Sequence, residues 1–149
     1  MQSKFFNHQG ASLHYQIGGK EAASVMVLLH GGFGSIADFE PLLPRLLQHY
    51  RVIAVDTRGH GRSTLGTTAL TYAQAADDVR QILRNESVEN YSLFGFSDGG
   101  ITAYRLGAED ENVEKIITVG AEWHQKHLNR VRSMFEALNL NIVEEKLSE

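Results

Sequence analysis

The run Val25–Leu29 is apolar at every position and continues directly into His30 and two glycines. A strand with one face in water alternates apolar and polar residues, so an unbroken run of this length predicts a strand covered on both faces. Residues 52–55 form a second such run, between Arg51 and Asp56. Strands covered on both faces belong to sheets that have helices on either side, which predicts an α/β fold.

The segments between these runs have helical spacing. Leu42, Leu43, Leu46 and Leu47 share one face and predict a helix with Asp38 as its cap, ending before residue 51. Residues 71–74 resemble a capping box and predict a second helix, and residues 101–108 predict a third. The second helix has an apolar stripe made of Tyr72, Ala75, Ala76, Val79, Ile82 and Leu83. Apolar residues at helical spacing predict one more helix near the end of the chain, at positions 128, 131, 134, 135 and 138.

Four further segments are typical of strands. Residues 3–8 and 11–17 predict a hairpin, and residues 91–96 and 113–119 predict two more strands. Strands and helices that alternate in this way predict a mostly parallel sheet with helices on both faces. Ligands of such sheets bind at the carboxyl ends of the strands, where this sequence places His30 to Gly32, residues 56–62, Ser97 and Glu122.

Composition excludes several classes of function. The chain has 149 residues, the length of one domain, and a net charge of −4 without a basic cluster, which argues against nucleic acid and anionic membranes as partners. It has no cysteine, so disulfides and thiolate metal sites are excluded. No apolar run could span a membrane and the start lacks a signal-peptide core, so a cytoplasmic location is expected.

Ser97 lies between Gly95 and Gly99, at the point where the predicted strand 91–96 gives way to a helix. The pattern G-x-S-x-G at a strand-to-helix turn is typical of a nucleophile elbow, in which a sharp turn exposes the serine hydroxyl. The glycines allow the turn because side chains there would collide with neighbouring backbone. A helix that begins at the turn also directs free N–H groups toward the hydroxyl, where they can stabilise an oxyanion.

Three motifs together resemble the serine α/β-hydrolase family. They are L-L-H-G-G-F-G-S at 28–35, D-T-R-G-H-G-R-S at 56–63 and G-F-S-D-G-G at 95–100, in the order and spacing of that family. Residues 95–103 are particularly similar to the branch of valacyclovir hydrolase-like small-ester hydrolases. The resemblance implies an α/β-hydrolase fold and hydrolysis of small carboxylic esters or amides through an acyl-enzyme, without cofactor or metal.

The resemblance also implies roles for individual residues. Ser97 would be the nucleophile, and the backbone N–H of Asp98 would be one oxyanion donor. Gly32, or alternatively Phe33, would supply the second donor. The Asp98 side chain could bind a substrate amine or cap the helix after Ser97, and the cap is favoured.

The histidines and the arginine of the other two motifs are expected to be structural. In the family the histidine of the His-Gly loop braces that loop by hydrogen bonds, and His30 occupies its position. Arg58 and His60 fall in a loop that the family uses for architecture.

The base that a serine nucleophile needs is not evident. In the family the catalytic histidine follows the last strand and the acid lies one strand earlier, so both are expected beyond Glu149. Residues 1–122 would then be the N-terminal part of the core, lacking the C-terminal strands and helices, and residues 123–149 the start of a cap or lid. Within the chain, Glu122 is a candidate acid and His124 and His127 are candidate bases.

An incomplete core would have a structural consequence, and two other classes of function remain open. The strand 113–119 would be an unprotected sheet edge, which predicts that the chain self-associates, is completed by a separate C-terminal segment, or is the ordered part of a longer enzyme. A dinucleotide-binding Rossmann-like domain is a rival, because residues 32–37 fit G-x-G-x-x-A and Asp56 ends the next strand. A non-catalytic hydrolase-fold binding module is a second rival.

Overall fold

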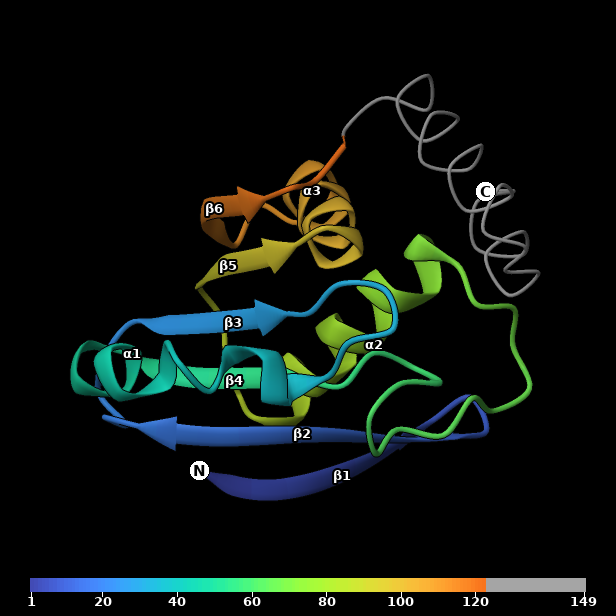
Figure 1. The fold of residues 1–149 in the computed structure, drawn as a ribbon, viewed down its shortest axis with the longest axis horizontal. Helices are drawn as coiled ribbons and strands as arrows, with labels where there is room; N and C mark the ends of the chain where they lie inside the picture. Colours follow the sequence, from blue (N-terminus) through green and yellow to red (C-terminus); the bar gives the residue numbers. More distant parts are fainter. Residues whose placement is uncertain (123–149) are drawn as a thin grey trace.

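The structure is a computed structural model that describes residues 1–122. It is one six-stranded sheet with helices on both faces (Figure 1). The strands are β1 Gln2–His8, β2 Ala11–Gly19, β3 Val25–Leu29, β4 Arg51–Val55, β5 Tyr91–Phe96 and β6 Val113–Val119. Between them lie the short 3-10 helix η1 Ile36–Phe39 and the helices α1 Leu43–His49, α2 Tyr72–Asn85 and α3 Asp98–Glu109.

The strand order is β1-β2-β4-β3-β5-β6. β1 and β2 form the predicted antiparallel hairpin and β2 is antiparallel to β4, whereas β4, β3, β5 and β6 are mutually parallel. From β3 the chain continues to β4 on one side and later to β5 on the other. The carboxyl ends of β3 and β5 therefore flank a topological switch point, the place where open α/β sheets bind ligands.

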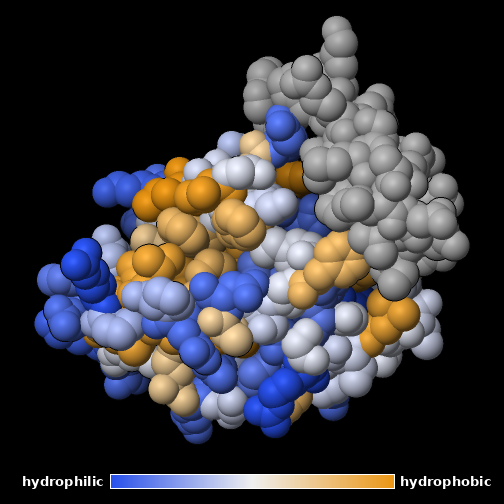
Figure 2. All heavy atoms as spheres, viewed as in Figure 1, coloured by the Kyte–Doolittle hydropathy of each residue, from blue (hydrophilic) through white to orange (hydrophobic). Residues whose placement is uncertain are grey.

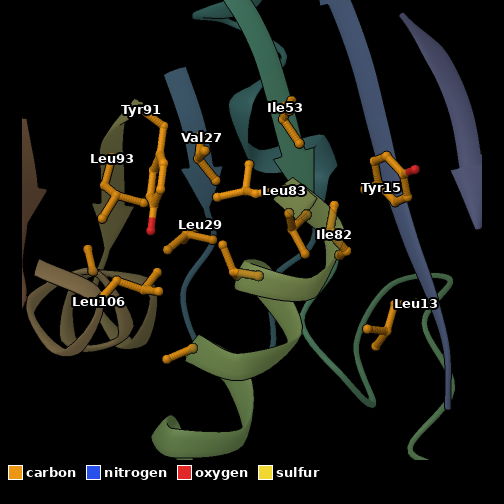
Figure 3. Close-up of a cluster of buried hydrophobic side chains, with 14 of the residues drawn as sticks. Leu13, Tyr15, Val27, Leu29, Ile53, Ile82, Leu83, Tyr91, Leu93 and Leu106 are labelled. Atoms are coloured by element: carbon orange, nitrogen blue, oxygen red, sulfur yellow. The ribbon is translucent and has the colours of Figure 1, made fainter. Parts of the chain in front are cut away.

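The two apolar runs lie in the middle of the sheet and contribute side chains to both of its faces. Alternate residues pack on one face with α2 and α3, among them Val27, Leu29 and Ile53 (Figure 3). The residues between them, including Leu28 and Val52, pack on the other face with η1 and α1. This arrangement confirms the predicted strands covered on both faces.

The prediction of a helix capped by Asp38 is wrong about where the helix begins. Ser35 caps the 3-10 helix η1, its hydroxyl accepting from the Ala37 N–H, and the Asp38 carboxylate in turn accepts from the Ser35 N–H. α1 begins only at Leu43 and has Pro44 in its first turn. Asp38 thus belongs to a capping box one turn earlier, and the segment forms two short helices rather than one.

β6 is an outer strand of the described sheet and is poorly covered. On the α1 side of the sheet, Ile117 and Val119 are paired in register with Phe94 and Phe96 of β5. Phe96, Ile117 and Val119 are each about half exposed. Figure 2 shows apolar residues gathered over β5 and β6 on this face. α2 and α3 lie on the opposite face, and on this face η1 contacts Phe94 through Phe39. We call Phe94, Phe96, Ile117 and Val119 the β5–β6 face; the last three remain largely exposed.

None of the helices within residues 1–122 has the length and apolar character that would let it cross a membrane.

Candidate active site

Ser97 occupies a strained turn between β5 and α3. Its φ of 50° and ψ of −116° lie outside the regions that residues with side chains prefer, and such a conformation costs about 1–3 kcal/mol. It is also the residue before the first turn of α3, so the first N–H groups of that helix follow directly after it. Strain of this kind persists where the surrounding structure holds a side chain in a required place.

The two glycines of the pattern are required by close backbone contacts. A Cβ on Gly99 would lie 2.0 Å from the Leu29 carbonyl oxygen, and one on Gly95 would lie 2.5 Å from the Gly99 carbonyl oxygen. Neither neighbour is a flexible side chain, so neither could move aside easily. The predicted elbow is therefore present in the structure, and its glycines have the predicted steric role.

The loop after β3 faces this elbow. A Cβ on Gly31 would lie 3.3 Å from the Ser97 Cβ, and one on Gly32 would lie 2.6 Å from Oδ2 of Asp98. Phe33 adopts a positive φ of 63° and its side chain is 59% exposed. The structure thus brings Gly31 and Gly32 together with Ser97 and Asp98 at the carboxyl ends of β3 and β5, and Phe33 follows Gly32 in the same loop.

The Asp98 side chain does not have the favoured role of helix cap. The cap position of α3 is occupied by Ser97, and Asp98 is the first residue of the helix. Its Oδ1 accepts a hydrogen bond of 3.0 Å from the Tyr72 hydroxyl. The carboxylate therefore links α3 to the start of α2.

His30 braces the loop, as the family resemblance implied. The Thr57 N–H donates to His30 Nε2 at 3.0 Å, so the proton is on Nδ1, which donates to the Gly31 carbonyl at 2.7 Å. The ring is 2% exposed. Burial lowers the pKa of His30, which favours this neutral form. With both ring nitrogens engaged, His30 holds the loops after β3 and β4 together.

Arg58 is architectural, as expected, and its side chain is fully buried. Its guanidinium forms two hydrogen bonds to the Asp78 carboxylate, at 2.8 and 2.9 Å, and others to three backbone carbonyls. Those carbonyls belong to His8, Gln9 and Leu65. The pair fixes the loop after β4 between α2 and the β1–β2 turn.

Asp56 does not fit the dinucleotide-binding alternative. Its carboxylate is 2% exposed and accepts from the N–H groups of Ile36 and Arg62 and from His14 Nδ1, at 2.9, 3.0 and 2.6 Å. Burial alone would raise the pKa of Asp56, but these hydrogen bonds outweigh it and hold the pKa below its ordinary value. A ribose-binding acid must present its oxygens to a ligand, whereas both oxygens here hold loops of the protein.

A small pocket adjoins the elbow on the α2 side. Ser97 is not one of its lining residues, but Gly31, Asp98 and Gly99 beside it are. The pocket extends from the elbow to the start of α2, and the rest of its wall is formed by His30, Thr57, His60, Leu70, Thr71, Tyr72, Ala75 and Thr102. Among the described residues there is no group of acidic and histidine side chains that could hold a metal ion.

The remaining predicted site residues lie at or beyond the last described position. Glu122 is the last residue that the structure describes, three positions after β6, and is partly buried. His124 and His127 lie outside the described residues, as does the predicted helix over 128–138.

Two residues at the site were not singled out from the sequence. Tyr72 was counted as part of the apolar stripe of α2, but its hydroxyl lies against Asp98. Asp78 lies on the buried face of the same helix. A carboxylate within an apolar stripe could have been recognised from the sequence as half of a buried ion pair, because a buried charge requires a partner such as Arg58.

Comparison with known proteins identifies the same fold. Residues 24–142 match the α/β hydrolase fold family. The chain is 36% identical over 101 residues to 3-oxoadipate enol-lactonase 1 of Acinetobacter baylyi, and the match covers 68% of this chain and 38% of that protein. It is 33% identical over 123 residues to a putative carbamate hydrolase of Variovorax paradoxus, covering 80% of this chain and 46% of the relative.

Solved structures agree. A carboxylesterase of the archaeon Nitrososphaera gargenis superposes with a TM-score of 0.81 at 27% identity, covering 93% of this chain and 54% of the other. An esterase of Rhodococcus superposes with a TM-score of 0.73 at 34% identity, covering 81% and 46%. The chain thus spans less than half the length of these two curated relatives. Over the part that it spans it has their fold, and it belongs to the α/β hydrolase fold family.

Proposed function

We propose that this chain carries the nucleophile half of a serine hydrolase that cleaves small carboxylic esters or amides. The observation that supports this most directly is the strained elbow at Ser97, which faces the loop containing Gly32. The relatives named as an enol-lactonase and esterases act on bonds of this type. A dinucleotide-binding role has no such support, because Asp56 is buried and fully engaged.

In the proposed reaction the Ser97 Oγ attacks the acyl carbon of the substrate while its proton passes to a base. The carbonyl oxygen becomes an oxyanion and accepts hydrogen bonds from the Asp98 N–H and from the N–H of Gly32 or Phe33. The intermediate then expels the alcohol or amine, which takes up the proton, and leaves an acyl-serine that water hydrolyses. Each oxyanion donor lowers the barrier by about 3 kcal/mol.

The base and its orienting acid are proposed to come from residues outside the described core. His30 uses both ring nitrogens to brace loops and is not available as a base. We place the boundary of this core near residue 122 and the beginning of a cap in 123–149. Glu122 as acid, with His124 or His127 as base, remains the alternative contained within the chain.

Fluorophosphonate labelling of the chain beside Ser97→Ala tests the nucleophile. We expect Ser97-dependent labelling after the chain is mixed with the C-terminal half of a related hydrolase, and Ser97→Ala should reduce it at least 100-fold. Ser87→Ala is a matched control, because Ser87 is an exposed serine that also has a positive φ, of 54°.

The arms of this experiment separate the alternatives. Ser97-dependent labelling of the chain alone would assign the base to the chain itself and favour His124 or His127. Equal labelling of the Ser97→Ala protein and the unchanged chain under both conditions would contradict the proposal and favour a non-catalytic binding module.

Within residues 1–122 no strand pairs with the outer edge of β6, which also supports a proposal about association. Antiparallel pairing of β6 with its copy in a second chain would satisfy the edge backbone groups of both chains and bring the two β5–β6 faces side by side. Exposed apolar residues on the same strand favour such contacts. We therefore expect the purified chain to self-associate in the absence of a C-terminal partner segment.

Light scattering after size exclusion measures this association. The mass of the chain should exceed that of one copy and rise with concentration, and Ile117→Lys should lower it toward one copy. Leu65→Lys, at an apolar side chain 52% exposed in the loop after β4, should leave the mass unchanged. A single-copy mass at all concentrations would refute the proposal.

A further inference from the structure

The Asp98 carboxylate lies between two segments that are far apart in the sequence. One oxygen, Oδ1, accepts the hydrogen bond from the Tyr72 hydroxyl at 3.0 Å. The other, Oδ2, lies 2.6 Å from the position that a Cβ on Gly32 would occupy. The same side chain thus contacts the first residue of α2 and the loop after β3.

The Tyr72 end of this contact is anchored to the core by hydrogen bonds of its neighbours in α2. Thr71 caps α2, its hydroxyl accepting from the Gln74 N–H at 2.9 Å. Asp78, in the second turn of α2, is held by the buried Arg58 guanidinium. The start of α2 is therefore fixed to the core, and the Tyr72 hydroxyl can hold the Asp98 carboxylate in one orientation.

The Gly32 end of the contact is close. A Cβ at this position would lie 2.6 Å from Oδ2 of Asp98, so any larger residue would require the carboxylate to move from its place beside Tyr72. The contact brings together the backbones of Gly32 and Asp98, whose N–H groups are the proposed oxyanion donors. Oxyanion donors act at 2.7–3.1 Å, and an error of about 1 Å can reduce a rate about 100-fold.

We propose that Tyr72 is a positioning residue: by fixing the Asp98 carboxylate against Gly32, it sets the spacing between the two backbone donors. This inference rests on the proposed function, because the spacing matters for catalysis only if Ser97 is a nucleophile. The contact itself is independent of that function. The two can therefore be tested separately.

Tyr72→Phe removes the hydroxyl and keeps the ring, and Tyr104→Phe is the matched control. The Tyr104 hydroxyl, also in α3, is paired with the Thr118 hydroxyl of β6 at 2.7 Å rather than with Asp98. Amide resonances of Gly32 and Asp98 report the contact in each variant. The maximal rate of fluorophosphonate labelling, measured after mixing with the C-terminal half of a related hydrolase and separated from the reagent's half-saturating concentration, reports its effect on catalysis.

We expect Tyr72→Phe to shift the Gly32 amide resonance, although the Tyr72 side chain contacts Asp98 rather than Gly32. Tyr104→Phe should leave the Gly32 resonance unchanged. The maximal labelling rate should fall about 10-fold in Tyr72→Phe, with little change in the half-saturating concentration. An unshifted Gly32 resonance, or an unchanged labelling rate in a chain that labels, would overturn the inference. A shifted resonance in a chain that never labels would uphold the contact and count against the proposed function instead.

Discussion

Arg58→Met is expected to lower the free energy of unfolding by about 4 kcal/mol, a large share of the stability of a domain of this size. The substitution leaves the Asp78 carboxylate, whose side chain is 4% exposed, buried without its cation. It also removes the donors for the carbonyl groups of His8, Gln9 and Leu65. Urea unfolding followed by far-ultraviolet circular dichroism measures the loss of unfolding free energy.

A surface ion pair gives the control. Arg80 is paired with Glu109 at 3.0 Å, but both side chains remain partly exposed, so Arg80→Met should cost less than about 1 kcal/mol. The double variant Arg58→Met with Asp78→Leu should recover part of the loss, because it removes both buried charges. Equal losses from Arg58→Met and Arg80→Met would show that the buried pair is not a major support of the fold.

The parts of the fold that the sequence predicted well depend on local patterns. The runs at 25–29 and 52–55 are apolar at every position because β3 and β4 are covered on both faces, and no distant residue is needed to recognise this. Thr71 was recognised as a cap because its partner, the Gln74 N–H, is three residues away. The glycines of the elbow were recognised for the same reason.

The errors and omissions concern contacts between distant segments. Asp38 was taken as a helix cap because it precedes an apolar stripe, but Ser35 three residues earlier competes for that role. Asp98 was also taken as a cap, whereas its partner is a tyrosine 26 positions upstream. Chain spacing does not encode such a partner, and Tyr72 was assigned to the core because tyrosine is compatible with an apolar stripe.

Gly99→Ala is expected to lower the free energy of unfolding by about 3 kcal/mol and to abolish Ser97-dependent labelling. The new Cβ would lie 2.0 Å from the Leu29 carbonyl oxygen and 2.6 Å from that of His30. Both oxygens belong to backbone at the carboxyl end of β3 and cannot rotate away. α3 would have to withdraw from β3, taking Ser97 and the Asp98 N–H away from Gly32.

Gly107→Ala in the same helix separates this steric effect from helix propensity. A Cβ there would lie 2.3 Å from the Cδ1 of Ile116, the tip of a side chain that is 37% exposed and can move. Alanine is also a better helix former than glycine, by about 1 kcal/mol, so this variant should be close to neutral and should label normally. Chemical denaturation and labelling of the two variants side by side measure the contrast. If Gly99→Ala labelled as well as Gly107→Ala, the close approach of α3 to β3 would not be what places Ser97 against the Gly32 loop.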